Sequence, residues 1–294
     1  MKPMWKKHTD ALWTLCSDAF IYHAGVILDA GEACLIDPGL LPSEIDAIAD
    51  FVSSRDAVPT TIVLTHCHWD HVLGPERFRD VRVLAHAEYL REVDGRQGRR
   101  TCRQVSQWET GRDIARETPF RLPRADATFD DEFVVHIGGQ GWTLMHAPGH
   151  ASDHIVLYEP SEGVLWSGDI LSDLEIPYVC QSLVAYRRTL ERLAKLEIRL
   201  LVPAHGNATA IRSEIRERLG ADAAYLDELQ DRIGRAVREG RSMEDTVSRC
   251  ESMVHRHPAE NDRAHRLNAE TVYVESGGEP PRRACGWTAL VEDA

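Results

Sequence analysis

The sequence predicts an α/β fold, in which sheets are covered by helices, followed by a helical extension. Up to about residue 210, short apolar runs alternate with stretches of helical periodicity, a mixture that is typical of layered domains. Beyond that point the strand-like runs stop, and apolar residues such as Leu226, Leu229 and Ile233 recur at helical spacing. We therefore expect one domain over residues 1–212 and a helical extension over residues 213–294.

The strands are predicted from apolar and β-branched runs that each lead into a turn. In chain order these runs are GVILDAG, EACLIDPG, TTIVLTH, VRVLAH, EFVVHI, WTLMHAPGH, HIVLYEP, GVLWSGD and IRLLVPAHG. The first two form a pair joined around Gly31. A helix is predicted for SEIDAIADFV, with Ser43 opening it and Asp46 three residues on, a shorter analogue of a capping box. A second helix is predicted for AYRRTLERLAKL, before the last strand. In the extension, helices are expected on either side of breaks at Gly240 and Pro258.

Composition narrows the class of protein. The 294 residues are 43% hydrophobic and carry a net charge of −13, so a sizeable core is expected, and binding to nucleic acid or an anionic membrane is disfavoured. No apolar run approaches the length of a transmembrane helix, and the N-terminus does not resemble a signal peptide. Seven cysteines without a C-x-x-C spacing favour a reducing compartment. We expect a cytoplasmic protein with a small-molecule substrate, and the sequence leaves homo-oligomerisation open.

Residues that can bind metals follow five of the strand-like runs, at the point where each run ends. They are Asp37, His66, His150, Asp169 and His205. In layered α/β proteins the loops at the carboxyl ends of strands converge on the functional site. The five residues are therefore candidates for one spatial cluster.

The stretch THCHWDH at residues 65–71 has the spacing of a metal site. In extended backbone His66 and His68 point the same way and can hold one cation. If the chain then turns at Trp69, Asp70 and His71 can face a second cation beside the first. Imidazole and carboxylate ligands suit Zn²⁺, and also Fe or Mn.

Together these motifs resemble a known ligand pattern. THCHWDH, the PGH that ends at His150, the SGD that ends at Asp169 and the PAHG that contains His205 are similar to the four ligand motifs of the metallo-β-lactamase superfamily. Asp37, in LIDPG, matches the structural aspartate that precedes them. The resemblance covers roughly residues 20–210 and implies an αββα sandwich with the site at one edge, making residues 1–212 the catalytic domain.

The resemblance also implies a role for each ligand of two divalent metal ions, with Zn²⁺ as the first expectation and Fe or Mn as alternatives. The first site is matched by His66, His68 and His150, the second by Asp70, His71 and His205, and the bridging carboxylate by Asp169. Asp37 is expected to anchor the ligand loop by hydrogen bonds.

This arrangement permits metal-assisted hydrolysis. Two cations would share a hydroxide whose pKa is lowered towards neutrality, and Asp70 would help to orient the attacking water or accept its proton. We expect a dinuclear metal hydrolase that cleaves a small ester, thioester or lactone. Aspartate at position 169 matches glyoxalase II and lactonases, whereas the zinc β-lactamases with a cysteine ligand there do not match.

Two other functions remain open within the same resemblance. One is an oxidoreductase similar to persulfide dioxygenases, which use one iron, and the other is a nuclease or phosphodiesterase. No counterpart of the glutathione-binding residues of glyoxalase II is found, and Ile170, Leu171 and Ser172 stand where lactonases have a tyrosine. The sequence therefore leaves the substrate open.

The remaining histidines and Cys67 are expected to have structural roles. Cys67 alternates away from its two histidine neighbours and should pack in the interior, and His154 is expected to support a ligand. His86, His136 and His146 lie in or at the ends of strand runs, where packing or structural roles are expected. His255 and His257 are expected on a helix, where their spacing directs them about 200° apart and makes chelation unfavourable.

Residues 91–124 form a basic stretch in an acidic protein, with nine arginines and five acidic residues. Gly95, Gly98 and Gly111 indicate loop character, and Trp108 could cover an apolar substrate. One hypothesis is a lid whose arginines, including Arg99, Arg100 and Arg103, contact an anionic substrate. The alternative is a solvated helical face with Arg–Glu pairs.

Overall fold

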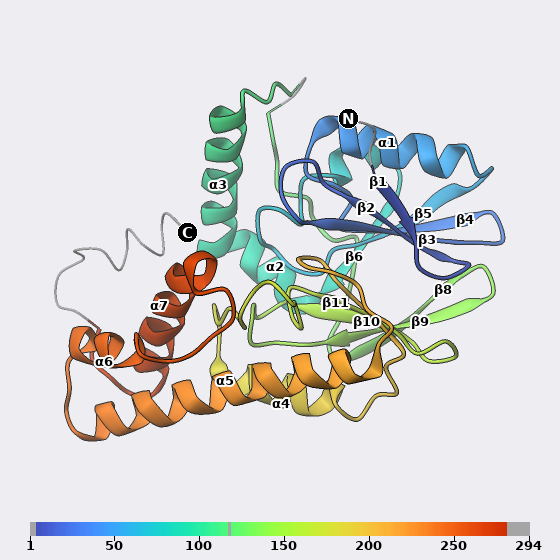
Figure 1. Cartoon of the computed structure of the whole chain (residues 1–294). Coiled ribbons are helices and arrows are strands. Elements are labelled where there is room, and N and C mark those ends of the chain that lie inside the picture. Colours follow the sequence, from blue (N-terminus) through green and yellow to red (C-terminus); the bar gives the residue numbers. More distant parts are fainter. Residues whose placement is uncertain (1–3, 117–118, 281–294) are drawn as a thin grey trace. The chain divides into compact units, whose positions relative to one another are not determined.

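The computed structural model describes residues 4–116 and 119–280 of the chain (Figure 1). Contacts divide the chain into two units, Met1–His146 with Ser152–Gly168, and Ala147–Ala151 with Asp169–Ala294. The predicted boundary after residue 212 stays a prediction. Within the described ranges, no helix is long and apolar enough to cross a membrane.

The first unit contains a seven-stranded sheet whose strands lie side by side in chain order. The first four strands pair antiparallel and the last four pair parallel. The parallel part places the carboxyl ends of β4, β5 and β6 along one edge. The strands are β1 (Met4–Lys7), β2 (Leu12–Cys16), β3 (His23–Asp29), β4 (Glu32–Ile36), β5 (Val58–Val63), β6 (Arg82–His86) and β7 (Ala127–Phe129).

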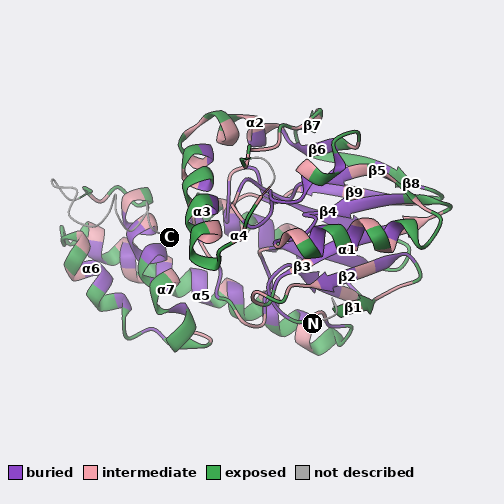
Figure 2. Ribbon diagram, turned by 90° about the horizontal axis from the view of Figure 1, so that it is seen from above, coloured by how far each residue is buried: buried purple, intermediate pink, exposed green. Residues whose placement is uncertain are grey.

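A second sheet in the same unit contains four strands that pair antiparallel in the order β11-β10-β9-β8. These are β8 (Glu132–Ile137), β9 (Gln140–His146), β10 (Ile155–Glu159) and β11 (Val164–Gly168). Every residue of β10 and β11 is buried, and β3 and β4 are also largely buried (Figure 2). The sheets meet where Gly25 of β3 lies against Trp166 of β11, because a Cβ at Gly25 would come 2.8 Å from the indole ring.

The helices of the first unit are α1 (Pro42–Ser53), the 3₁₀ helix η1 (Pro75–Phe78), α2 (Ala87–Asp94) and α3 (Arg96–Arg112). Ile45, Ile48 and Val52 of α1 pack into the core. The predicted start of α1 at Ser43 was wrong, because the helix begins at Pro42.

The side chain of Glu44, rather than a Ser43–Asp46 pair, caps the start of α1. Its carboxylate accepts hydrogen bonds from the backbone N–H groups of Leu40 and Leu41. Asp46 instead forms a surface ion pair with Arg77. A carboxylate from the first turn of the helix therefore holds the backbone that leads into it.

The arginine-rich stretch is mostly helical, so its predicted loop character was wrong. Gly95 joins α2 to α3, and Gly98 is buried where the two helices approach, with Val93 against it. Several arginines of the stretch form ion pairs with acidic residues: Arg91 with Glu88, Arg116 with Glu76 and Glu109, and Arg124 with Asp94.

The second unit holds β12 (Leu200–Pro203), α4 (Leu183–Leu193), α5 (Arg212–Arg238), α6 (Met243–Cys250) and α7 (Pro258–Glu275). The predicted helices of the extension are confirmed, and α5, α6 and α7 pack against one another (Figure 1). His255 and His257 were wrongly predicted to be helical. They lie in the connection between α6 and α7, where His257 has a positive φ of 43° and precedes the first residue of α7.

Candidate metal centre

Asp37 anchors the loop that follows β5. Its buried carboxylate accepts hydrogen bonds from the backbone N–H and the hydroxyl of Thr65, at 2.8 and 2.6 Å, and contacts Nδ1 of His71 at 2.9 Å. Burial raises the pKa of the Asp37 carboxyl, while His71 and the hydrogen bonds from Thr65 act in the opposite direction. The predicted anchoring role of Asp37 is confirmed.

These contacts orient the imidazole rings of the loop. When Nδ1 of His71 donates to Asp37, its Nε2 keeps a lone pair that can bind a cation. Nδ1 of His66 lies 3.0 Å from the hydroxyl of Thr65, which directs its other nitrogen away from that contact. His66 and His68 lie with their ring centroids 4.4 Å apart.

The residue between His66 and His68 is fixed through both of its backbone groups. The N–H of Cys67 donates to the carboxylate of Asp153 at 2.8 Å, and its carbonyl accepts from the hydroxyl of Thr101 on α3 at 2.6 Å. All three residues are buried, and the predicted packing of Cys67 is confirmed. Because the backbone between the two histidines is held from both sides, their spacing is fixed by the fold.

The second unit carries the other three candidate ligands. Nδ1 of His150 contacts the carbonyl oxygen of Tyr178 at 2.9 Å, and its Nε2 lies 3.4 Å from Oδ2 of Asp169. The second oxygen of that carboxylate, Oδ1, lies 3.5 Å from Nε2 of His205. Each oxygen of Asp169 therefore faces a different histidine.

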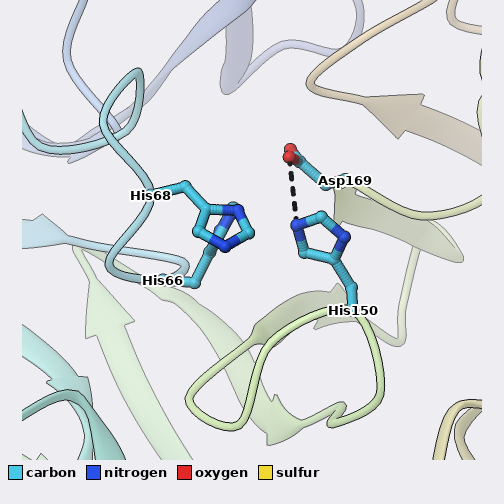
Figure 3. A group of neighbouring side chains, drawn as sticks. All are labelled: His66, His68, His150 and Asp169. Carbon is cyan, nitrogen blue, oxygen red and sulfur yellow. Dashed lines mark ion pairs between the residues drawn. The ribbon is translucent and has the colours of Figure 1, made fainter. Parts of the chain in front are cut away.

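These distances match the donor atoms of a metal site. Two ligands each about 2.1 Å from a tetrahedral zinc ion lie about 3.4 Å apart. Two groups of side chains, in which the ligand atoms lie within 4.8 Å of one another, could hold a metal ion. Figure 3 draws one of them and shows the carboxylate of Asp169 facing the imidazole of His150. The groups are His66, His68, His150 and Asp169, and Asp70, His71 and His205.

The seven candidate ligands thus fall into these two groups, while their roles as ligands stay a proposal. Of these side chains, those of Asp70 and Asp169 are about one tenth exposed and those of His66 and His71 are fully buried. The donor atoms come from five imidazoles and two carboxylates. Such a set suits Zn²⁺, Fe or Mn better than Ca²⁺ or Mg²⁺.

His86 and His146 have structural roles, as expected. His86 caps α2 by accepting from the N–H of Glu88, and its ring stacks on that of His146 at 3.6 Å. His154 is buried, with its ring 5.2 Å from His66. His136 was expected to pack but is exposed on β8, which is the edge of its sheet.

The family profile of the metallo-beta-lactamase superfamily matches residues 18–205, which is more than half of the chain. The chain belongs to this superfamily. The matched region begins before Asp37 and ends at His205, so it contains every candidate ligand. The predicted α/β architecture of this superfamily, with a C-terminal helical extension, is therefore confirmed.

Curated relatives include enzymes as well as proteins named only for their fold. The chain is 29% identical over 201 residues to a beta-lactamase-like protein 2 homolog of Drosophila melanogaster, a match covering 67% of this chain and 61% of that protein. It is 32% identical over 198 residues to human acyl-coenzyme A thioesterase MBLAC2, covering 62% of this chain and 69% of the relative. The chain therefore spans less than two thirds of the length of the Drosophila protein.

Solved structures give the same fold. A metallo-beta-lactamase family protein from Thermus thermophilus has a TM-score of 0.63 and 23% identity, with 90% of this chain and 93% of that one covered. The sec-alkylsulfatase Pisa1 from Pseudomonas sp. has a TM-score of 0.71 at 15% identity, covering 93% of this chain and 50% of the other. The superfamily match, together with curated relatives named as a thioesterase and an alkylsulfatase, supports the predicted metal-dependent hydrolase.

Sequence patterns did not reveal three residues that hold the ligands in place. Thr65 lies inside the THCHWDH motif, and Asp153 and Thr101 belong to no motif. Asp153 lies only three residues beyond His150, so its nearness to a ligand motif was the available signal. Thr101 contacts Cys67 across 34 positions of sequence, and no spacing rule predicts such a contact.

Through Asp153, the free energy of unfolding is expected to depend on pH. Burial, and after it the nearby carboxylate of Glu92, raises the pKa of Asp153 from 3.8 to about 8. Between about pH 4 and pH 8 the folded protein retains a proton that the unfolded chain has released, so the free energy of unfolding falls as the pH rises. The Asp153→Asn variant cannot ionise but can still accept from Cys67. Its stability relative to the wild type should therefore increase with pH, by at most about 1.4 kcal/mol per unit.

Urea unfolding at several values between about pH 5.5 and pH 8, with a chelator present, measures this difference. The exposed Asp46→Asn serves as the control, and its difference from wild type should not change with pH. A constant difference for Asp153→Asn across the range would contradict the assigned proton.

Proposed function

We propose that this protein is a metal-dependent hydrolase that cleaves an acyl thioester with the help of two divalent metal ions. Zn²⁺ is the first expectation, and Fe or Mn are the alternatives. The observation that carries the proposal is the pair of neighbouring ligand groups, each with its donor atoms within 4.8 Å. Bound metal ions at such a site supply an activated water at neutral pH and polarise the carbonyl of the substrate.

In this proposal each of the two groups of side chains holds one metal ion. His66, His68 and His150 hold one ion, and Asp70, His71 and His205 hold the other. Asp169 would be shared between them, which is supported by its two oxygens lying 3.4 Å from Nε2 of His150 and 3.5 Å from Nε2 of His205.

Asp70 has two proposed roles, as a ligand and as the group that orients the attacking water or accepts its proton. Its Oδ1 lies 3.7 Å from Nε2 of His71, and its side chain is about 10% exposed, so one face of the carboxylate reaches solvent. By contrast, His71 is fully buried and held by Asp37. Among these two neighbours, Asp70 is therefore the one that water can reach.

Among the ester, thioester and lactone substrates expected from the sequence, the relatives favour the thioester. Human, chicken and bovine relatives are all named acyl-coenzyme A thioesterase MBLAC2. Because the matches leave part of the relatives and of this chain uncovered, the substrate is carried over as a proposal. A thioester of coenzyme A would also meet the expectation of an anionic substrate.

A basic face of α3 fits an anionic carrier. Arg96, Arg99 and Arg103 are exposed and lie on one side of the helix, since their spacing of three and four residues is helical. No acidic side chain in residues 4–116 and 119–280 forms an ion pair with these three arginines. The opposite side of α3 contacts the ligand loop, where Trp108 lies 4.8 Å from Trp69. Phosphate groups of coenzyme A could bind this face.

We also propose, as the sequence suggested, a cytoplasmic location and a catalytic domain that ends at residue 212. The six cysteines within the described ranges are free, as a reducing compartment requires. The persulfide dioxygenase and nuclease alternatives differ in the metal and substrate they require, and the assays below distinguish them.

The thioesterase proposal predicts that the zinc-loaded protein releases free thiol from acyl-coenzyme A, followed with a thiol-reactive dye. Removing the metal with a chelator should abolish the activity, and adding Zn²⁺ or Mn²⁺ should restore it. The Asp70→Asn variant should lower kcat by about 100-fold or more, because general-base and metal-ligand functions are both removed. His136→Ala, at an exposed histidine, is the control and should keep wild-type activity. Activity on alkyl sulfates or phosphodiesters alone would contradict the substrate assignment.

If the basic face of α3 binds coenzyme A, its loss should change KM for one class of substrate only. Replacing Arg96, Arg99 and Arg103 with alanine should raise KM for acyl-coenzyme A about 10-fold, given about 0.5 kcal/mol for each exposed ion pair. KM for a short thioester without the nucleotide should not change. Replacing Arg216, Arg235 and Arg238 of α5 gives an equal change of charge as a control. Unchanged kinetics, or an equal effect on both substrates, would refute the assignment of this face.

A further inference from the structure

The carbonyl that orients His150 belongs to a loop segment held by α7. Nδ1 of His150 contacts the backbone carbonyl of Tyr178, and Tyr178 lies in the connection between β11 and α4. The neighbours of Tyr178 in sequence are both bound by one side chain, that of Asn268. Its Oδ1 accepts from the N–H of Val179 at 2.7 Å, and its Nδ2 donates to the carbonyl of Pro177 at 2.6 Å.

A second asparagine on α7 makes the same kind of contact two turns earlier. Oδ1 of Asn261 accepts from the N–H of Ile176 at 3.3 Å, and its Nδ2 donates to the carbonyl of Leu174 at 2.9 Å. The seven residues from Asn261 to Asn268 advance about 10.5 Å along a helix. The two asparagines thus bind the same loop segment at separate points, Asn261 around Glu175 and Asn268 around Tyr178.

The hydrogen bonds around Asn268 have a fixed direction. The carbonyl of Cys250 can only accept, so Nε2 of His265 donates to it and leaves Nδ1 as an acceptor. The hydroxyl of Tyr225 donates to that Nδ1 at 2.8 Å and accepts from Nδ2 of Asn268 at 3.0 Å. Burial lowers the pKa of His265, which agrees with a neutral ring carrying one proton. A flipped amide of Asn268 would place its Nδ2 against the N–H of Val179 and its Oδ1 against the carbonyl of Pro177, so both bonds to the segment would be lost.

We infer that Asn268 is a positioning residue for the metal centre: by holding Pro177 and Val179, it aims the carbonyl of Tyr178 at Nδ1 of His150. With Nδ1 donating to this carbonyl, Nε2 of His150 keeps its lone pair and faces Oδ2 of Asp169. The C-terminal helices thus contribute to metal affinity through a fully buried amide that does not itself touch the site. This inference rests on the proposed function, because it assumes that His150 binds a metal ion.

Asn261 provides the matched control, since it is buried on the same helix and brackets Glu175 rather than Tyr178. We would strip the full-length protein of metal and measure its Zn²⁺ affinity by competition with a chromogenic chelator. The Asn268→Ala variant should bind Zn²⁺ about 10- to 100-fold more weakly than the wild type. Asn261→Ala should bind it with nearly wild-type affinity. Thermal unfolding with a chelator present should show similar losses of stability for both variants.

Equal weakening of Zn²⁺ affinity in both variants, or none in Asn268→Ala, would overturn the inference while leaving the metal site intact. If the wild type itself binds no Zn²⁺, the proposed function fails instead. Should Asn268→Ala not fold, Tyr225→Phe decides, because it removes only the hydroxyl that fixes the amide. That variant should weaken Zn²⁺ binding by a smaller factor, and wild-type affinity would count against the inference.

Discussion

The buried carboxylate of Asp37 is the contact on which the ligand loop of the first unit depends. One oxygen accepts from the backbone of Thr65, and the other contacts both the hydroxyl of Thr65 and Nδ1 of His71. Asp37 itself has a φ of 44°, a conformation that aspartate tolerates better than most residues. Its carbonyl is held in turn by the hydroxyl of Tyr22. A histidine ligand needs a lone pair on the nitrogen that faces the metal, and this network leaves it on Nε2 of His71.

The second unit meets the same requirement with a different kind of acceptor. Here the partner of His150 is a main-chain carbonyl, which needs support from elsewhere because a loop does not hold its own peptide groups rigidly. Gly149 precedes this ligand with a φ of 129°, and a Cβ there would come 2.3 Å from the backbone of Tyr186. The ligand is thus held by close approach of α4 on one side and by its Nδ1 contact on the other. The fold thus serves the proposed chemistry by orienting the imidazole rings of its ligands.

Much of the fold could be predicted from the sequence, because strands and helices follow local patterns of apolar residues. The motif around His66 and the isolated Asp169 and His205 could be found because a ligand set requires particular residue types at strand ends. Helix starts were less predictable: Glu44 caps α1 from inside the helix, and Ser43 carries the more familiar signal. The loop character expected for the arginine-rich stretch was wrong because its glycines serve helix packing and a helix junction rather than a turn.

The supporting contacts could not be predicted, and for one reason. Asp153, Thr101 and Asn268 bind backbone groups 86, 34 and 89 positions away, through hydrogen bonds that leave no local pattern in the sequence. Such residues have no spacing rule, because their partners are brought near only by the packing of whole elements. A structure shows that a polar side chain is buried against a ligand loop, whereas the pattern of residues in the sequence does not indicate it.

These side chains are proposed to hold two divalent metal ions. Inductively coupled plasma mass spectrometry of the protein, purified without added metal, would measure its metal content. About two zinc or manganese ions per chain are expected. One iron per chain would contradict the dinuclear hydrolase and favour oxygen-dependent sulfur chemistry. No bound metal, even after reconstitution, would contradict the metal centre itself.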